Sequence, residues 1–307
     1  MTQDRKGERS TNANDIYELG LEEFPLQLKD SILRPKRLFC KGILPDKDAI
    51  GIAMVGTRRP SNSAKELCRR LVESLRGTNA VVVSGLAQGI DSYCHEAALN
   101  AGIKTIAVIA QGLEAQFHGS QAELARRIVS EGSCIVTEYE GDAPSYKGTF
   151  PARNRIISGL SRATVLVQSK TKGGALITAD YCLQEGKLLL AIPGDFDSEV
   201  ASGPNLYLDQ GKANPVFTPE SLRIDAGLQL IEAPQASLQQ LELFGCNLSE
   251  EAKVFFKQFN GFRKTFSDLQ KESNFKTGNI LAILTELEIA GLVQTQDNYQ
   301  FYFNGSD

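Results

Sequence analysis

Short apolar runs rich in β-branched residues recur along the middle of the chain, and segments with helical periodicity separate them. The apolar runs lie at 52–56, 80–84, 105–110, 134–137, 164–167 and 188–192. The helical segments lie at 61–76, 89–101, 121–131, 151–160 and 175–185. Near-continuous apolar strands that alternate with amphipathic helices are typical of βαβ units. The pattern therefore predicts an α/β fold with a mostly parallel sheet that is covered by helices on both faces.

The C-terminal part has a different pattern, in which three helical segments precede two β-like runs. The helices are expected from Ser249 onward, at 265–272 and at 277–290, and the β-like runs at 292–295 and 300–303. Three helices followed by a hairpin is the order of a winged helix. The segment before it is rich in Gln and Leu and contains Pro234, which indicates a linker. The predicted divisions are a tail and lead-in at 1–46, an α/β domain at 47–224, a linker at 225–246 and a winged-helix domain at 247–307.

The overall charge argues against a protein that covers itself with nucleic acid. Lys and Arg number 33, Asp and Glu number 37, and the formal net charge is -4. A nucleic-acid site on this chain must therefore be a local basic patch.

The cysteines and histidines are too scattered for a metal site. The six cysteines form no C-x-x-C pair, and the only histidines are His95 and His118. A structural zinc needs about four clustered ligands, so we expect no metal, and no motif indicates a cofactor. The N-terminus lacks the apolar core of a signal peptide, and no apolar run reaches the length of about 18 residues that a membrane span needs. We expect a cytoplasmic protein with reduced thiols and no membrane segment.

Three of the predicted strands end in turns that suit an anion. In an open parallel sheet, ligands bind at the carboxyl ends of the strands, where helix N-termini and bidentate arginines attract phosphates. The candidate residues in these turns are Gly56, Thr57, Arg58, Ser84, Gly85, Lys172, Gly173, Gly174 and Thr178. The glycines do not have the G-x-G-x-x-G spacing, and the last loop lacks the G-K-[ST] ending, so neither a dinucleotide site nor ATP hydrolysis is indicated. Each turn alone also fits a capped βα connection, whereas several on one edge indicate a groove for a polyanion.

The segment 147–155 is the densest basic signal in the chain. Its candidate residues are Lys147, Phe150, Arg153, Asn154 and Arg155. Basic groups neutralise phosphates, and an aromatic ring stacks on a base; the alternative interpretation is a solvated basic face with a packed phenylalanine. No nucleophile–base pair or carboxylate pair stands out, and a lone His95 on a helix is typical of a satisfied core residue. We therefore expect a binding protein and not an enzyme.

Taken together, these motifs resemble those of the bacterial DNA-processing protein A family (DprA, also called Smf), over about residues 24–213. The resemblance rests on V-G-T-R at 55–58, S-G-L-A-Q-G-I-D at 84–91 with His95, F-P-A-R-N-R-I-I at 150–157, G-A-L-I-T-A at 174–179, I-P-G at 192–194 and S-G-P-N at 202–205. It implies an extended Rossmann-like domain that binds and protects single-stranded DNA, forms a homodimer and loads the RecA recombinase during natural transformation.

The same resemblance implies a role for each candidate residue. Arg58 would clamp a phosphate, Lys147 would hold the DNA backbone, and Phe150 would stack on a base. The side chains of 153–155 would shape this pocket, and the turn at 173–174 would offer backbone N–H groups to a phosphate.

Two alternatives stay open because the chain departs from the family pattern. Gln168 stands where the family usually has an acidic residue, and Q-F-H at 116–118 replaces its usual Tyr-Pro. A diverged copy could sense DNA or nucleotides, or act as an antitoxin, in an anti-phage defence system. A nucleotide phosphoribohydrolase of the "lonely guy" type is less well supported, because its P-G-G-x-G-T motif is missing.

The charge of the predicted winged helix points away from duplex reading. From Ser249 onward the chain has six basic and eight acidic residues, and the presumed recognition helix at 277–290 has no basic stripe. A DNA-reading helix carries such a stripe, so the module is expected to contact a protein partner.

Overall fold

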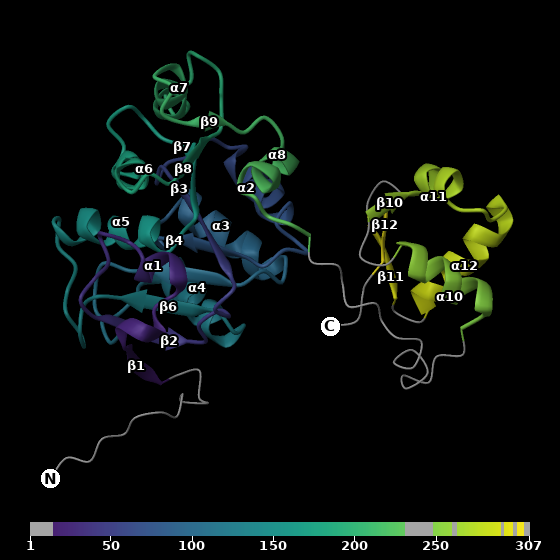
Figure 1. Cartoon of the computed structure of the whole chain (residues 1–307), viewed down its shortest axis with the longest axis horizontal. Helices are drawn as coiled ribbons and strands as arrows, with labels where there is room; N and C mark the ends of the chain where they lie inside the picture. The colour runs from purple at the N-terminus through teal and green to yellow at the C-terminus, as the bar shows by residue number, and fades with distance from the viewer. Residues whose placement is uncertain (1–14, 231–247, 260–262, 290–291, 297–299, 304–307) are drawn as a thin grey trace, which may run out of the picture. The chain divides into compact units, whose positions relative to one another are not determined.

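The computed structural model describes residues 15–230, 248–259, 263–289, 292–296 and 300–303. It divides the chain into two compact units, Met1–Leu230 and Ile231–Asp307 (Figure 1). The first unit contains the predicted strand–helix alternation, and the second contains the predicted C-terminal helices and hairpin.

The first unit is built on one nine-stranded sheet. Its strands are β1 (Ile16–Leu19), β2 (Leu38–Gly42), β3 (Ile50–Gly56), β4 (Ala80–Ser84), β5 (Thr105–Val108), β6 (Cys134–Thr137), β7 (Ala163–Gln168), β8 (Leu188–Ala191) and β9 (Asn214–Pro215). They lie in the order β1-β2-β6-β5-β4-β3-β7-β8-β9, and the pairs from β6 to β9 along that order are all parallel. The predicted α/β fold with a mostly parallel sheet is confirmed.

The predicted lead-in is part of this sheet and not a separate segment. Strand β2 pairs antiparallel with β6, where Phe39 lies opposite Thr137, and β1 pairs antiparallel with β2. Leu28 and Leu38 are fully buried in the core beneath the sheet. The lead-in therefore satisfies backbone groups of β6 that would otherwise form an open edge.

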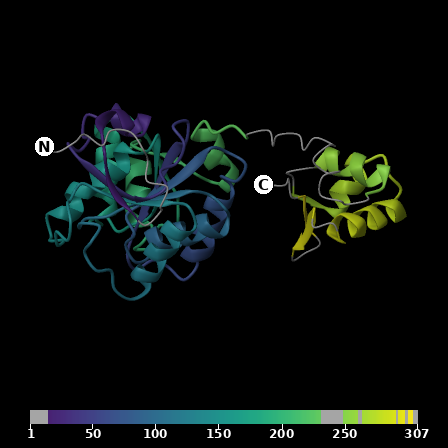
Figure 2. The same ribbon diagram turned by 90° about the horizontal axis from the view of Figure 1, so that it is seen from below.

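Helices cover both faces of the sheet, as Figure 2 shows with the sheet between its helical layers. They are α1 (Leu26–Lys29), α2 (Ala64–Glu73), α3 (Ile90–Asn100), α4 (Gly119–Ser130), α5 (Thr149–Gly159), α6 (Ala175–Gln184), α7 (Ser202–Asp209) and α8 (Pro219–Asp225), with a 3-10 turn at Leu21–Glu23. Helices α1, α5 and α6 contribute to one buried cluster, and α2, α3 and α8 to another on the opposite face.

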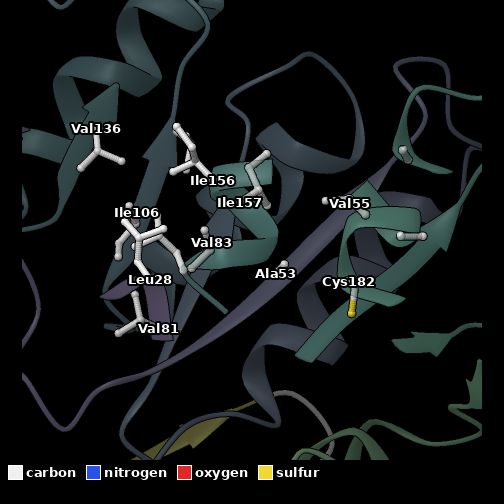
Figure 3. Packing of buried hydrophobic residues seen from close by; sticks show 14 of the residues in the cluster. Leu28, Ala53, Val55, Val81, Val83, Ile106, Val136, Ile156, Ile157 and Cys182 are labelled. Atoms are coloured by element: carbon white, nitrogen blue, oxygen red, sulfur yellow. The ribbon is translucent and has the colours of Figure 1, made fainter. Parts of the chain in front are cut away.

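Strand β3 shows why both faces are covered. Ala53 and Val55 belong to the cluster with α5 and α6, part of which is drawn in Figure 3, whereas Ile52 and Met54 belong to the cluster with α2 and α3. Successive side chains of a strand point to opposite faces. A strand that is apolar at every position therefore needs a helical layer on each side, which is what the run at 52–56 predicts.

The sheet reverses its order of strands beside β3. From β3 the chain adds β4, β5 and β6 on one side, and then β7, β8 and β9 follow on the other side of β3. In such a sheet the connections on the two sides diverge, which leaves a crevice at the carboxyl ends of the two strands at the switch point. Here those strands are β3 and β7.

The first unit extends into the segment predicted as a linker. Ala226 and Leu228 are buried against the α2 and α3 side of the sheet, so the described chain leaves this unit only after them. The rest of the predicted linker, 231–246, lies outside the described residues, as do residues 1–14 of the predicted tail and lead-in.

The second unit has its own aromatic core. Its elements are α10 (Glu250–Phe259), β10 (Arg263–Thr265), α11 (Phe266–Glu272), α12 (Thr277–Ile289), β11 (Val293–Gln296) and β12 (Gln300–Phe303), and the sheet order is β10-β12-β11. Phe255, Phe259 and Phe303 pack with ring centroids 4.9–6.1 Å apart. The three helices and the two strands follow the predicted order, and β10 was not predicted. The turn of the hairpin, at 297–299, lies outside the described residues.

Candidate nucleic-acid interface

The turn after β3 is tied to the end of β7, so the switch point is a fixed edge. The Thr57 N–H donates to the Gln168 carbonyl oxygen at 2.7 Å. The Gln168 side chain accepts from the Ser61 N–H at 2.9 Å and donates to the Ser61 hydroxyl at 2.8 Å. Both polar ends of this glutamine are used within the turn, which holds Arg58 between two anchored residues.

The same turn rests on the start of α3 through a glycine. Gly89 has φ +91°, a conformation that favours glycine, and a Cβ there would overlap the Thr57 carbonyl oxygen. The Ile90 N–H donates to that oxygen at 3.3 Å. The close approach that glycine permits therefore lets the turn that carries Arg58 pack directly against the start of α3.

Arg58 and Phe150 form the centre of the site. The Arg58 guanidinium carbon lies 5.3 Å from the centroid of the Phe150 ring, within the range of a cation–π contact. Arg58 is exposed at the end of β3, and Phe150 is half-buried in the first turn of α5. Two residues that are far apart in the sequence thus form one unit with a phosphate donor and an aromatic ring.

Lysines extend this centre on both sides. Lys147 is exposed immediately before α5, and Lys172 is exposed on the loop between β7 and α6. The Asn154 side-chain amide donates to the Gly174 carbonyl oxygen at 3.3 Å, which joins α5 to the first turn of α6. The structure therefore brings the predicted turns after β3 and β7 and the segment 147–154 to one edge.

Arg153, which was predicted to shape the DNA-binding pocket, lies beneath this surface. Its side chain is 5% exposed. It donates to the Gly85 carbonyl oxygen at 2.6 Å, to the Val108 carbonyl oxygen, and to the Asn154 side chain at 3.2 Å. The guanidinium therefore joins Asn154 to the ends of β4 and β5 and braces the site from below.

Asp91 provides the counter-charge for this buried arginine. Its carboxylate accepts from the Gly85 N–H at 3.1 Å. Burial lowers the pKa of Arg153 to about 10 and raises the pKa of Asp91, and the attraction between the two groups offsets part of each shift. The nearby Arg58 also lowers the pKa of Arg153, because like charges repel.

The turn at Gly85 is shaped by this brace. A Cβ at Gly85 would lie 2.7 Å from the atoms of the Arg153 guanidinium, so the position accepts only glycine without rearrangement. At Gly56 a Cβ would collide with the side chain of Ile90. These two predicted site residues therefore serve close packing below the site.

Four further predicted residues are used inside the protein. The Ser84 hydroxyl is buried and donates to the Met54 carbonyl oxygen at 2.6 Å. Thr178 is 1% exposed, one turn into α6. The Gly173 N–H donates to the Lys170 carbonyl oxygen at 2.9 Å.

Arg155 forms an ion pair with Glu138 and donates to the Leu33 carbonyl oxygen, so it ties α5 to β6 and to the lead-in. These groups are buried or have partners within the protein, and their predicted role in DNA binding stays a prediction.

His95 is a core residue, as the sequence suggested. It is fully buried, and its Nδ1 lies 2.7 Å from the Thr105 hydroxyl. Burial lowers its pKa to about 3, and the positive charge of Arg153 adds to that shift. The ring is therefore neutral at ordinary pH and has no access to a ligand.

Gln168 and Asp91 are the residues of the site that the sequence reasoning left without a role. In the sequence, Gln168 is only a departure from a family pattern, and Asp91 is only part of a motif. The available signal was their polarity at positions next to buried strands and helices. A polar group placed there needs a partner, and the partners are Ser61 and the Gly85 turn.

No metal-ligand cluster and no membrane span was found in the described part of the chain. Within it, no three His, Cys, Asp or Glu side chains gather so that they could hold a metal ion. None of its helices is long and apolar enough to cross a membrane. Five free cysteines are buried there, and Cys246 lies outside the described residues.

The fold and the site together define a class: a doubly wound α/β protein with a cation–aromatic pair at its switch point. The sequence model of the family "DNA recombination-mediator protein A" matches residues 16–226, which is most of the first unit. The chain belongs to this family, as the motifs predicted.

Individual relatives agree with this assignment. The chain is 35% identical to Protein Smf of Escherichia coli over 219 residues, which cover 70% of this chain and 58% of that protein. It is 34% identical to the DNA processing protein DprA of Bacillus subtilis, with 73% and 72% of the two chains covered.

Two solved structures share the fold. DNA processing protein A of Streptococcus pneumoniae matches with a TM-score of 0.62 and 30% identity over 68% of this chain and 74% of that one. The Helicobacter pylori protein, whose structure is described as showing a single-stranded DNA binding mode, matches with a TM-score of 0.60 and 26% identity over 69% and 95%.

Proposed function

We propose that this chain binds single-stranded DNA along the carboxyl edge of its sheet, without a sequence preference. The observation that carries the proposal is the contact between the exposed Arg58 and the half-buried ring of Phe150. The guanidinium can bind a phosphate oxygen with two hydrogen bonds, and an aromatic ring stacks on the face of any base. A duplex keeps its bases stacked inside, so a ring at this position selects unpaired strands.

The distribution of cations supports this assignment. Arg58, Arg59, Lys147 and Lys172 are exposed on the loops of this edge, although the whole chain has a net charge of -4. A local basic patch on an acidic protein is the pattern expected when one groove follows a phosphate backbone. The single-stranded DNA binding described for the Helicobacter pylori relative supports the same ligand here.

We infer that binding, and not catalysis, is the activity of this edge. His95, which is the histidine nearest to the site in sequence, is buried and neutral. Asp91 is also buried and is engaged with the Gly85 turn. Groups that cannot reach a ligand cannot serve it as acid, base or nucleophile.

We further propose that a homodimer of this chain protects the bound strand and then delivers it to the RecA recombinase. The description of the family as a recombination mediator supports this step. The second unit is acidic overall in sequence and is assigned a protein contact in the same process.

A titration tests the DNA-binding proposal. Labelled oligothymidylate and a duplex of equal length are titrated with the full chain and with Phe150→Leu, and Ile43→Leu serves as an exposed control at the opposite edge of the sheet. Phe150→Leu should weaken single-strand binding about 5- to 150-fold, the range for loss of one base–aromatic stack. Equal affinity for duplex and single strand, or unchanged affinity of Phe150→Leu, would contradict the proposal.

Delivery is tested separately. RecA filament formation is followed on a strand already covered by a single-strand-binding protein, with the full chain present or absent. Faster filament formation with the wild-type chain but not with Arg58→Ala is expected. Equal rates in all three reactions would contradict the delivery step and leave the binding result intact.

A further inference from the structure

A second aromatic ring stands beside the proposed DNA site. Tyr146 is 66% exposed, although a tyrosine ring is largely apolar. It lies four residues before Phe150, and the exposed Lys147 lies between them in sequence. Neither the sequence motifs nor the proposed function gives this ring a role.

The backbone of Tyr146 is held rigidly. Its N–H donates to the Thr149 hydroxyl at 3.1 Å, and its carbonyl oxygen accepts from the Thr149 hydroxyl at 2.8 Å and from the Thr149 N–H at 3.0 Å. Thr149 is itself only 1% exposed, so the turn is anchored in the protein. The ring is therefore presented by a fixed turn, which lowers the entropy lost when a ligand stacks on it.

The ring itself is also placed by a neighbour. A Cβ at Gly148 would lie 2.9 Å from the ring atom Cε2 of Tyr146, so the ring packs close to the Gly148 backbone. The glycine allows this contact, and most of the ring surface remains open to solvent. A flat, open aromatic surface on a rigid support is what base stacking requires.

Tyr146 lies in the connection that leads into α5, next to the residues of the proposed DNA site. Arg58 follows β3, and Phe150 begins α5. Tyr146 is close enough to Tyr139, just after β6, to help raise the pKa of that phenol, although burial and Glu138 contribute more. The segment that carries Tyr146 connects the end of β6 to the start of α5, whereas Arg58 follows β3.

The charges around Tyr146 permit a phosphate backbone to pass. Glu138 forms an ion pair with Arg155, and Glu140 forms one with Arg37 at 2.9 Å. These pairs neutralise two carboxylates of the 138–142 segment, and Asp142 is its remaining exposed acid. Lys147 supplies the cation next to the ring.

We propose that Tyr146 is a second base-stacking platform, which holds the nucleotide next to the one on Phe150. The inference rests on the proposed single-stranded DNA binding and extends it: the site engages two consecutive bases, one on each side of Lys147. The ligand class is an unpaired nucleobase of either pyrimidine or purine type, because stacking uses only the π-face.

The test compares Tyr146→Leu and Tyr146→Phe on two ligands, an oligothymidylate and an abasic oligonucleotide of the same length. Tyr146→Leu should weaken oligothymidylate binding at least about fivefold and leave abasic binding unchanged. Tyr146→Phe should retain wild-type affinity, since the ring and not the hydroxyl is used. An equal loss on both ligands, or no loss on either, would overturn the proposal.

Fluorescence gives a readout that a change in folding does not imitate. The chain has no tryptophan, so Tyr146→Trp, Phe150→Trp and Ile43→Trp each carry a single reporter. Ile43 is 55% exposed and follows β2, at the amino end of β6, on the opposite edge of the sheet. Oligothymidylate should quench the reporters at 146 and 150 but not at 43.

The two proposals fail in different ways. Quenching at 150 without quenching at 146 would overturn the second platform and leave the DNA site intact. Absence of oligothymidylate binding by the wild-type chain would overturn both.

Discussion

The edge of the sheet has two layers that use the same residue types for opposite purposes. In the upper layer Arg58, Lys147 and Phe150 are open to solvent or only half-buried. In the lower layer Arg153 and Asp91 are buried, and their polar atoms are engaged with backbone groups at the ends of β4 and β5. Arg153 is only three residues from Phe150 along α5, so one turn of helix separates the two layers.

The difference follows from the cost of removing a charge from water. A buried guanidinium loses hydration and is tolerated only where its donors are used and a counter-charge is near. An exposed guanidinium keeps its hydration until a phosphate replaces it. The lower layer should therefore determine stability, and the upper layer should determine affinity and its dependence on salt.

The largest effect is expected in the lower layer. Arg153→Met leaves Asp91 without its counter-charge and leaves the Gly85 and Val108 carbonyl oxygens without a donor, so unfolding should become easier by about 3–5 kcal/mol. Denaturant unfolding measures this loss. Arg59→Met, on the exposed turn, should change stability by no more than about 0.5 kcal/mol. Similar values for the two variants would show that burial does not separate the layers.

The second effect is a pH dependence that comes from the buried His95. In the unfolded chain the imidazole binds a proton below about pH 6.5, whereas in the folded chain it does so only near pH 3. Between these values the unfolded state binds more protons, so the free energy of unfolding decreases as the pH falls. At pH 5 the loss should be about 2 kcal/mol relative to neutral pH.

His95→Gln removes this titration, so its stability should fall less between neutral pH and about pH 5 than that of the wild type. His118→Gln is the matched control, because His118 is exposed at the start of α4 and should keep the wild-type pH dependence. Equal pH slopes for wild type and His95→Gln would mean that the lower layer is open to solvent.

A smaller effect is expected where the layers meet. Gly89→Ala places a side chain against the Thr57 carbonyl oxygen at a backbone conformation with φ +91°. Gly102 also has a positive φ, +69°, but its Cβ would meet nothing within 4 Å. Gly89→Ala should therefore cost at least about 1 kcal/mol more than Gly102→Ala, and it alone should weaken DNA binding, because it displaces the turn of Arg58. Equal effects on stability and affinity would contradict the close approach.

The sequence predicted most of the first unit because its strands are apolar at nearly every position. Runs such as 52–56 and 80–84 have no other stable environment than a sheet with two covered faces. Strand β1 was missed because it lies at the sheet edge and is largely exposed, so its four residues, I-Y-E-L, show no apolar alternation. Strand β2 is buried between β1 and β6, but its short run L-F-C-K-G stands outside the regular strand–helix alternation. The two-residue β9 has no periodicity to recognise.

The motifs predicted which residues belong to the candidate site, but they did not predict which of these residues are exposed and which are buried. Lys147, Arg153 and Arg155 lie within nine residues, and their spacing alone does not show which of them faces solvent. Arg153 donates hydrogen bonds to two backbone carbonyl oxygens at the ends of other strands. Arg155 forms an ion pair with Glu138 and a hydrogen bond with the lead-in, so both side chains are engaged within the protein. These partners are distant in sequence, so only the tertiary structure separates the ligand-binding cations from the structural ones.

The salt dependence of oligothymidylate binding tests the two layers most directly. The slope of log affinity against log salt concentration is measured for wild type, Arg58→Ala and Arg155→Gln, between about 50 and 200 mM salt. Each phosphate contact that is lost should reduce the slope by about 0.7. Arg58→Ala should show this reduction, and Arg155→Gln should keep the wild-type slope. A reduced slope for Arg155→Gln together with an unchanged slope for Arg58→Ala would contradict the account.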